Sequence, residues 1–219
     1  MGTHRIIFGE FFSFLKFANF HQAMTPIEKL ENVFINQIGM DKDTFALSIP
    51  YWQLRNYQKG EFYNEYKNIC KHLGFIIDGV FRIYRINEET GEEKNMLFFS
   101  KNEFIASYKS FLSQTACSYF TESMVDSTII YIHIDSLNSL YEKSHKWERF
   151  GRIVAEQAFQ AVMTATEGLL FKSAEERYTE LIDQHPDIFN AVPLYHIASY
   201  LGIKGPSLSR IRKRMAHSN

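Results

Sequence analysis

The chain has few cysteines and lacks any long run of hydrophobic residues. Its two cysteines, Cys70 and Cys117, lie too far apart in the sequence to form a pair of metal ligands, so we expect two buried, reduced thiols. A membrane-spanning helix needs roughly 18 consecutive apolar residues, and no run in the sequence reaches that length. Both absences favour a cytoplasmic protein without a membrane partner.

Motifs typical of enzymes are also absent. The sequence contains no Gly-x-Ser-x-Gly nucleophile motif, no His-Glu-x-x-His zinc motif and no glycine-rich phosphate-binding loop. We therefore expect no catalytic residue, no metal site and no cofactor. The chain is predicted not to be an enzyme.

Acidic residues are missing from one end of the chain. Residues 188–219 contain no Asp or Glu, whereas the whole chain has 25 of them against 24 Lys and Arg. Five basic residues fall in this segment, which leaves 19 basic against 25 acidic residues in the rest of the chain. An acidic body with a basic end is typical of a protein that binds nucleic acid through that end. The five basic residues are Lys204, Arg210, Arg212, Lys213 and Arg214.

The spacing of apolar residues predicts helices towards both ends of the chain and strands between them. A helical spacing runs from Pro26 to about Ile38, and short strands with turns such as Asp78-Gly79 occupy residues 57–134. An apolar stripe over residues 150–169 predicts one helix of roughly 25 residues. A capping box at residues 173–176 predicts the start of the next helix.

These patterns divide the chain into four parts. Met24 begins a more usual N-terminal sequence than Met1 does, so we expect residues 1–23 to be an extension from the gene model; a genuine N-terminal helix is the alternative. Residues 24–145 are predicted to form an antiparallel, sensor-like β-roll, and residues 146–172 a long helix. The unbroken stripe of that helix favours pairing with a second copy of the chain, although packing on its own roll is the alternative. Residues 173–219 are predicted to form a DNA-binding domain.

The DNA-binding prediction depends on the spacing of a helix-turn-helix. Ala198 is small where two helices must approach closely, and Gly202 follows four positions later, where the turn needs a positive φ. Leu208 and Ile211 come ten and thirteen positions after Ala198, where they seal the second helix on the first. We therefore expect the second helix to begin near Pro206.

The outward face of this second helix supplies the predicted DNA contacts. Recognition helices contact base edges with their first residues and phosphates further along. We therefore assign base contacts to Ser207, Ser209 and Arg210. Arg210 in particular can pair with the edge of a guanine. A basic face that only contacts solvent is the alternative. The residues assigned to phosphate are Lys204, Lys213 and Arg214.

The order of the predicted parts resembles the Crp/Fnr family of bacterial transcription regulators, in variants of the Bacteroidetes type. The resemblance covers about Met24 to Met215 and implies an α+β fold: a cupin-like, cyclic-nucleotide-binding-like β-roll, a long dimerisation helix and a C-terminal helix-turn-helix domain. It implies DNA and a second copy of the chain as partners, and RNA polymerase as a further candidate partner. The chain ends soon after the second helix, so we expect little or no wing. The most similar segments are His72–Arg82, Ser173–Tyr178, His196–Ile203 and Ser207–Lys213.

The chain departs from the family where cyclic AMP would bind. Members that bind cyclic AMP have a Gly-Glu pair and a later Arg, but Asn102-Glu103 stands here and no Lys or Arg occurs between Lys109 and Lys143. A buried cyclic phosphate needs a cation or a nest of N–H groups, so we expect no cyclic AMP and leave the effector unidentified. The candidate residues for a different ligand are Tyr108, Tyr119 and Thr121, with simple packing of these side chains as the alternative.

Two further points limit the resemblance. Where the family often reads bases with an Arg and a Glu, this chain has Gly205 and Pro206, so its target DNA differs, although Arg210 matches the family's later reading Arg. A second hypothesis also stays open. In it, the chain is a small-molecule-binding module of the cyclic-nucleotide type whose helical tail contacts a protein partner.

Overall fold

The first helix starts at a capping box. The structure is a computed structural model that describes residues 24–217, and its helix α1 spans Pro26–Asn36. The Thr25 hydroxyl accepts a hydrogen bond from the Glu28 N–H, and the Glu28 carboxylate accepts one from the Thr25 N–H at 2.7 Å. Two backbone donors at the start of the helix are thereby satisfied. The predicted extension, residues 1–23, lies outside the described residues.

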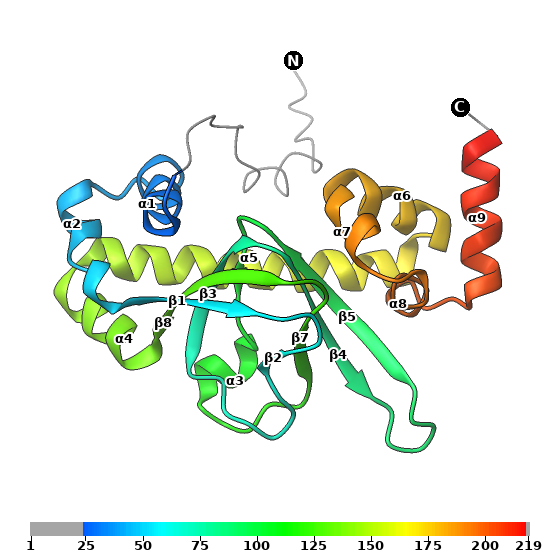
Figure 1. Ribbon diagram of the computed structural model, residues 1–219, viewed down its shortest axis with the longest axis horizontal. Helices are drawn as coiled ribbons and strands as arrows, with labels where there is room; N and C mark the ends of the chain where they lie inside the picture. Colours follow the sequence, from blue (N-terminus) through cyan, green and yellow to red (C-terminus); the bar gives the residue numbers. More distant parts are fainter. Residues whose placement is uncertain (1–23, 218–219) are drawn as a thin grey trace, which may run out of the picture.

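Eight strands within the described residues form two antiparallel sheets (Figure 1). The strand order is β1-β8-β3-β6 in the first sheet and β2-β7-β4-β5 in the second. This arrangement confirms the predicted α+β fold with an antiparallel β-roll. The strands are β1 (Trp52–Tyr57), β2 (Phe62–Asn64), β3 (His72–Asp78), β4 (Val80–Ile86), β5 (Glu93–Ser100), β6 (Phe104–Ile105), β7 (Phe120–Ser123) and β8 (Ser127–His133).

The chain crosses from the first sheet to the second at the predicted Asp78-Gly79 turn. Gly79 has a φ of +116°, and a Cβ atom at this position would lie 2.0 Å from the Ser127 hydroxyl oxygen. Only glycine fits this backbone and this close approach. The strands on either side of the turn, β3 and β4, therefore lie in different sheets.

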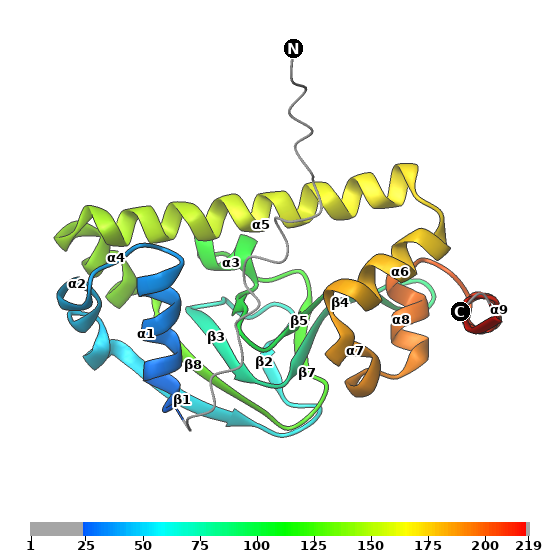
Figure 2. The same cartoon turned by 90° about the horizontal axis from the view of Figure 1, so that it is seen from above.

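Helices surround the roll and continue beyond it. The long helix α5 (His145–Phe171) runs along the length of the molecule, with α1, α2 and α4 near one end and the C-terminal helices at the other (Figures 1 and 2). The capping box predicted at Ser173 and Glu176 is confirmed at the start of α6. Within residues 24–217 no helix is long and apolar enough to cross a membrane. The other helical elements are α2 (Lys42–Ala46), η2 (Ile49–Tyr51), α3 (Tyr108–Ser113), α4 (Ile134–Lys143), α6 (Ala174–Gln184), α7 (Pro186–Ala191), α8 (Leu194–Tyr200) and α9 (Gly205–His217).

An aromatic cluster joins α1 to the first sheet and to the start of α5. The ring centroid of Phe34 lies 4.5 Å from that of Phe150, 4.9 Å from that of Trp147 and 5.2 Å from that of Phe45. Phe34, Trp147 and Phe150 are each 0% exposed. The N-terminal part of α5 is therefore fixed to the roll by packing of its own apolar side chains.

Replacing Phe34 with Ala should cost about 3–5 kcal/mol of unfolding free energy, because it removes a ring with several aromatic neighbours and leaves a cavity. Denaturant unfolding of the two proteins measures this difference. Leu54→Ala on β1 is the control: its side chain is 54% exposed, so the expected change is within about 0.5 kcal/mol. Equal losses for the two variants would contradict this description of the core.

Candidate nucleic-acid interface

Helices α8 and α9 form the predicted helix-turn-helix. The turn contains Gly202 at a φ of +66°, which confirms the predicted glycine position. The Ile203 N–H donates to the Ala198 carbonyl at 3.0 Å and closes the end of α8 as a Schellman-type cap. Ala198, Leu208 and Ile211 are 2%, 1% and 6% exposed, so these three side chains pack α9 against α8.

The opposite face of α9 carries the residues assigned to DNA from the sequence. Ser209, Arg210 and Lys213 are exposed along this face, and Ser207 is half-buried near its start. Arg210 bends back on its own helix: its guanidinium donates to the Ser207 hydroxyl at 3.4 Å. Arg214 is exposed and forms an ion pair with Glu175 of α6. In the structure, Ser207 and Arg210 are therefore in contact, and Arg214 forms an ion pair with a residue of the same C-terminal region.

The start of α9 carries positive charge. Exposed Lys204 precedes the helix, and its carbonyl accepts from the N–H groups of Ser207 and Leu208. The first turn of α9 contains no acidic residue. The N–H groups of Ser207 and Leu208 are thus already bonded and Pro206 has none, so the charge of Lys204, aided by the positive end of the helix dipole, is what attracts an anion here. The start of α9 is thus suited chemically to a phosphate group.

Helix α8 covers the free edge of strand β5, which is the last strand of the second sheet. The Asn95 N–H donates to the Ser199 hydroxyl at 3.1 Å, and that hydroxyl donates to the Glu93 carbonyl at 2.8 Å. The Asn95 side-chain amide donates to the His196 carbonyl at 3.3 Å. Backbone groups that an edge strand would leave unpaired are therefore bound by α8.

Arg82 lies between the second sheet and α8 and is the only buried Lys or Arg among the described residues. Its guanidinium forms salt bridges of 2.6 Å with both Glu93 and Glu122. It also donates to Asn95 Oδ1 at 3.2 Å and to His196 Nδ1 at 2.8 Å. Burial lowers the pKa of Arg82, but the hydrogen bonds that Arg82 donates to Glu93 and Glu122, together with the charges of these carboxylates, outweigh burial and raise it.

His196 is held in its neutral form by this arrangement. Arg82 has no hydrogen-bond acceptor, so His196 Nδ1 must accept and the ring proton must sit on Nε2. Burial and the neighbouring Arg82 lower the pKa of His196 to about 4, against a smaller opposite effect of Glu93. Protonation of His196 would place a second cation and an N–H donor against Arg82.

Apolar side chains complete the contact between the roll and the C-terminal helices. Val80, Phe98 and Met124 of the roll share one buried cluster with Ile188 and Ile197 of α7 and α8. The Lys101–Asp187 ion pair, at 3.1 Å, also joins the roll to α7, and His185 Nδ1 lies 3.6 Å from a carboxylate oxygen of Glu103. The contact therefore has an apolar centre as well as the polar group around Arg82.

Two of the three ligand candidates, Tyr108 and Thr121, contact other side chains. Tyr108 stacks on Phe111 at a centroid distance of 6.3 Å. The Thr121 hydroxyl is buried against the Ser107 hydroxyl at 3.0 Å. Tyr119 is half-buried, and burial raises its pKa. These contacts favour packing as the role of the Tyr108 and Thr121 side chains.

Side chains fill the space between the two sheets. The Tyr57 ring meets the Phe81 ring edge to face at 5.5 Å, and the Tyr63 hydroxyl donates to the His72 carbonyl at 2.7 Å. Asn102, which stands where the family has Gly, has a φ of +68°. The buried cluster in this space consists of Tyr57, Ile76, Phe81, Ile105 and Ile129.

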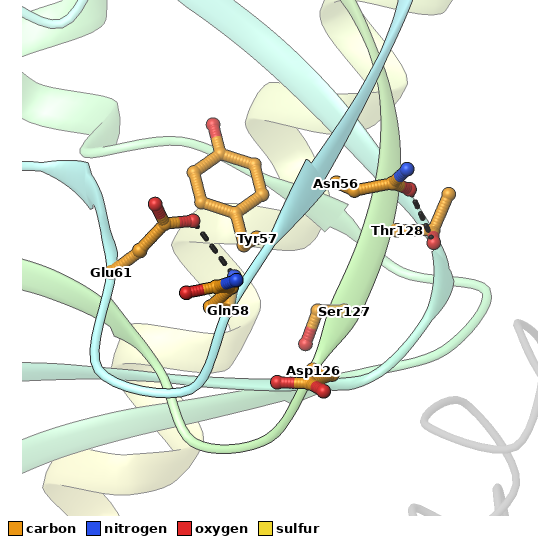
Figure 3. A pocket seen from close by; sticks show the side chains of 7 residues that line it. All are labelled: Asn56, Tyr57, Gln58, Glu61, Asp126, Ser127 and Thr128. Atoms are coloured by element: carbon orange, nitrogen blue, oxygen red, sulfur yellow. Dashed lines mark hydrogen bonds between the residues drawn. The ribbon is translucent and has the colours of Figure 1, made fainter.

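A depression of about 640 Å³ borders this cluster at Tyr57, where β1 ends and β8 begins (Figure 3). Its carboxylates already bind backbone: Glu61 accepts from the Gln58 N–H at 2.7 Å, and Asp126 accepts from the Lys59 N–H at 3.0 Å. Its lining contains no Lys or Arg. A phosphate-bearing ligand therefore finds no counter-charge there.

The fold of this chain matches that of known proteins. No family model and no curated protein matches the sequence, but many solved structures match the fold. FixK2 from Bradyrhizobium japonicum aligns with a TM-score of 0.66 and 16% identity, over 76% of this chain and 85% of that chain. A transcriptional regulator of the Crp/Fnr family from Eubacterium rectale aligns with a TM-score of 0.62 and 14% identity, over 82% and 85%. The chain has the Crp/Fnr fold.

A third match is a CooA variant from Carboxydothermus hydrogenoformans, with a TM-score of 0.62 and 15% identity over 84% of each chain. At such identities the likeness establishes the Crp/Fnr fold alone. The predicted fold class is confirmed. The Bacteroidetes-type variant and the individual DNA-contacting residues stay predictions.

The contact around Arg82 was not predicted from the sequence. In the sequence of strand β4, Arg82 and Arg85 both occupy the charged positions expected of a half-buried strand. In the structure, however, Arg82 is buried and Arg85 is exposed. The sequence also gives no reason to single out His196 among eight histidines. A buried arginine between two packed elements becomes visible only when the helix that covers it is known.

The folded state should lose stability as the pH falls from about 6.5 towards 4. His196 binds a proton more weakly when folded, so it contributes stability above its usual pKa of 6.5 and loses that contribution as the pH falls to about 4. The expected contribution to the loss of unfolding free energy between pH 7 and pH 4 is about 3 kcal/mol.

His196→Asn is the matched control for this prediction, because its side-chain oxygen can accept from Arg82 without titrating. Denaturant unfolding across this pH range should show a shallower pH dependence for His196→Asn than for the original chain. Identical pH profiles for the two proteins would mean that His196 does not bind Arg82 in its neutral form.

Proposed function

We propose that the chain is a dimeric, DNA-binding transcription regulator of the Crp/Fnr type. The observation that carries the proposal is the α9 face, where exposed basic side chains follow a helix start without an acidic residue. The Crp/Fnr fold supports it, since the structures it matches include transcriptional regulators. The absence of common catalytic motifs agrees with a regulator rather than an enzyme. Such a regulator acts in the bacterial cytoplasm, where the DNA lies, and RNA polymerase is a further proposed partner.

In this proposal α9 enters the major groove of DNA. Ser207, Ser209 and Arg210, in the first two turns of α9, would contact base edges. Lys204 and Lys213 would contact phosphates before and after these residues. Arg214 would add a phosphate contact beside its ion pair with Glu175. Residues 173–219 would together act as the DNA-binding domain.

The dimer in this proposal forms through the C-terminal half of α5. Val154, in the first half of the helix, is buried against the chain's own roll. Beyond it, α5 exposes several apolar side chains that lie three, four or seven residues apart, which is typical of a helix that pairs with another helix. They are Phe159 (67% exposed), Val162 (55%), Met163 (41%), Leu169 (62%), Leu170 (69%) and Phe171 (81%), the last residue of the helix.

We propose further that cyclic AMP is not the signal. The cluster around Tyr57 and Phe81 occupies the space between the sheets. The only buried Lys or Arg among the described residues, Arg82, faces α8 and is paired with two carboxylates. A cyclic phosphate between the sheets would therefore lack a cation. Control by a partner that moves α8 away from the roll fits the structure better than control by cyclic AMP.

Replacing Arg210 and Lys213 together with Ala should weaken binding to promoter DNA by about tenfold to a hundredfold at fixed salt, because a base contact and a phosphate contact are lost. Fluorescence anisotropy with labelled duplex DNA measures the change. The control, Lys42→Ala with Lys109→Ala, removes the same charge from exposed positions on the roll. Unchanged affinity in the α9 variant would remove the basis of the proposal.

Replacing Phe159 and Leu169 with Glu should convert the dimer to a monomer, because four charges would meet in the paired helices. Analytical ultracentrifugation gives the mass of each protein in solution. Leu112→Glu on α3, at a side chain that is 61% exposed, should leave the dimer intact. A monomeric original chain at micromolar concentration would contradict the dimer.

A further inference from the structure

Arg210 lies folded back along α9 towards the start of the helix. Its Nε donates to the Pro206 carbonyl oxygen and its Nη2 donates to the Ser207 hydroxyl, each at 3.4 Å. Side chains in a helix lean towards its N-terminus, so a long side chain reaches the preceding turn without strain. The guanidinium of Arg210 therefore lies beside the first turn of α9, one turn before its own Cα atom.

The charges along α9 favour the same direction. Lys213 and Arg214 follow Arg210 by three and four positions, so they lie on the same side of the helix and repel its guanidinium. The first turn contains no acidic residue. It holds the guanidinium through two neutral oxygen atoms, of Pro206 and Ser207, which do not cancel its charge.

The first two residues of α9 have no side chain that could form a hydrogen bond with a base. Gly205 and Pro206 are both exposed, and neither has a polar side-chain atom. A Cβ atom at Gly205 would meet nothing within 4 Å, so the space in front of this turn is open. A donor beside these two residues must come from later in the helix, and Arg210 supplies it.

Ser207 is suited to hold the guanidinium rather than to contact a base itself. It is half-buried, its hydroxyl oxygen lies only two bonds from its Cα atom, and its N–H donates to the Lys204 carbonyl at 2.9 Å. The bonds from Arg210 to the helix use the Nε–Nη2 edge of the guanidinium. The Nη1–Nη2 edge of Arg210 can then donate two hydrogen bonds to O6 and N7 of a guanine.

We propose that Ser207 is a positioning residue, which holds Arg210 in the orientation that contacts a guanine at the start of α9. This inference rests on the proposed function, because it refines how the same α9 face recognises DNA. A side chain that is already ordered in its bound orientation loses less freedom on binding, so affinity for the correct base rises. Phosphate contacts come from other residues, so Ser207 affects the choice of base and not the general affinity for DNA.

The test starts from a duplex that the original chain selects from DNA of randomised sequence. Each guanine is replaced in turn by 7-deazaguanine, which lacks the N7 acceptor. At one position this should weaken binding of the original chain but not of Arg210→Ala. Ser207→Ala should lose about two- to tenfold of the preference for guanine at that position, with unchanged binding to random duplex DNA and unchanged salt dependence. Ser207→Thr, which keeps a hydroxyl, should retain the preference.

A double-mutant cycle separates positioning from direct contact. Ser207→Ala should cause no further loss in an Arg210→Ala background, because it acts only through Arg210. Ser209→Ala is the matched control, since the Ser209 hydroxyl donates to the Gly205 carbonyl at 3.2 Å instead. Any loss that Ser209→Ala causes should add to that of Arg210→Ala. Thermal unfolding confirms that each variant is folded.

The outcomes separate the inference from the proposed function. If the original chain binds duplex DNA and Ser207→Ala keeps its full preference for guanine, the inference is wrong and the proposed function stands. Additive losses for Ser207→Ala and Arg210→Ala would also overturn it, because Ser207 would then contact DNA by itself. If the original chain binds no duplex DNA, the proposed function falls and the inference falls with it.

Discussion

The buried guanidinium of Arg82 is the interaction on which the arrangement of this molecule depends. A buried arginine is costly unless carboxylates and further acceptors surround it, and Glu93, Glu122, Asn95 and His196 supply them here. Three of these partners come from the roll and the fourth comes from α8. In the roll alone, the guanidinium of Arg82 would lack its hydrogen bond to His196. The hydrogen bond from Arg82 to His196 completes the set of partners of Arg82, and it therefore also fixes the C-terminal helices to the second sheet.

The contact around Arg82 joins two parts of the molecule whose surfaces and interiors differ in chemistry. On one side is a roll whose interior is filled by side chains, and on the other is a basic helix that faces solvent. Strand β5 is the element common to both, because it belongs to the sheet, carries Glu93 and Asn95, and is covered at its edge by α8. A signal that reaches β5 can therefore be passed to α9 by a small movement of α8. In the proposed regulator, the contact of α8 with β5 is the place where a change in the roll would reach α9.

The sequence predicts the parts of this structure that local chemistry determines. The turn at Gly202 and the capping box at Ser173 follow from residues within one or two turns of helix, and both are confirmed. The long helix was predicted, but its stripe did not show that Phe150 packs on the roll while Phe159 stays exposed. The contact of Arg82 with His196 joins residues 114 positions apart, and no periodicity carries that information. The DNA contacts are proposed from the positions of the residues along α9.

Amide hydrogen exchange at neutral pH tests the role of Arg82 most directly. The Asn95 N–H donates to Ser199, so it reports the docking of α8 on β5. In an Arg82→Met variant this amide and those of α8 should exchange about a hundredfold faster, the factor that corresponds to losing about 3 kcal/mol, while amides of β3 and β8 keep their protection. Arg85→Met, at an exposed arginine on the same strand, should leave all of them unchanged. Equal exchange at Asn95 in the original chain and in Arg82→Met would contradict the account.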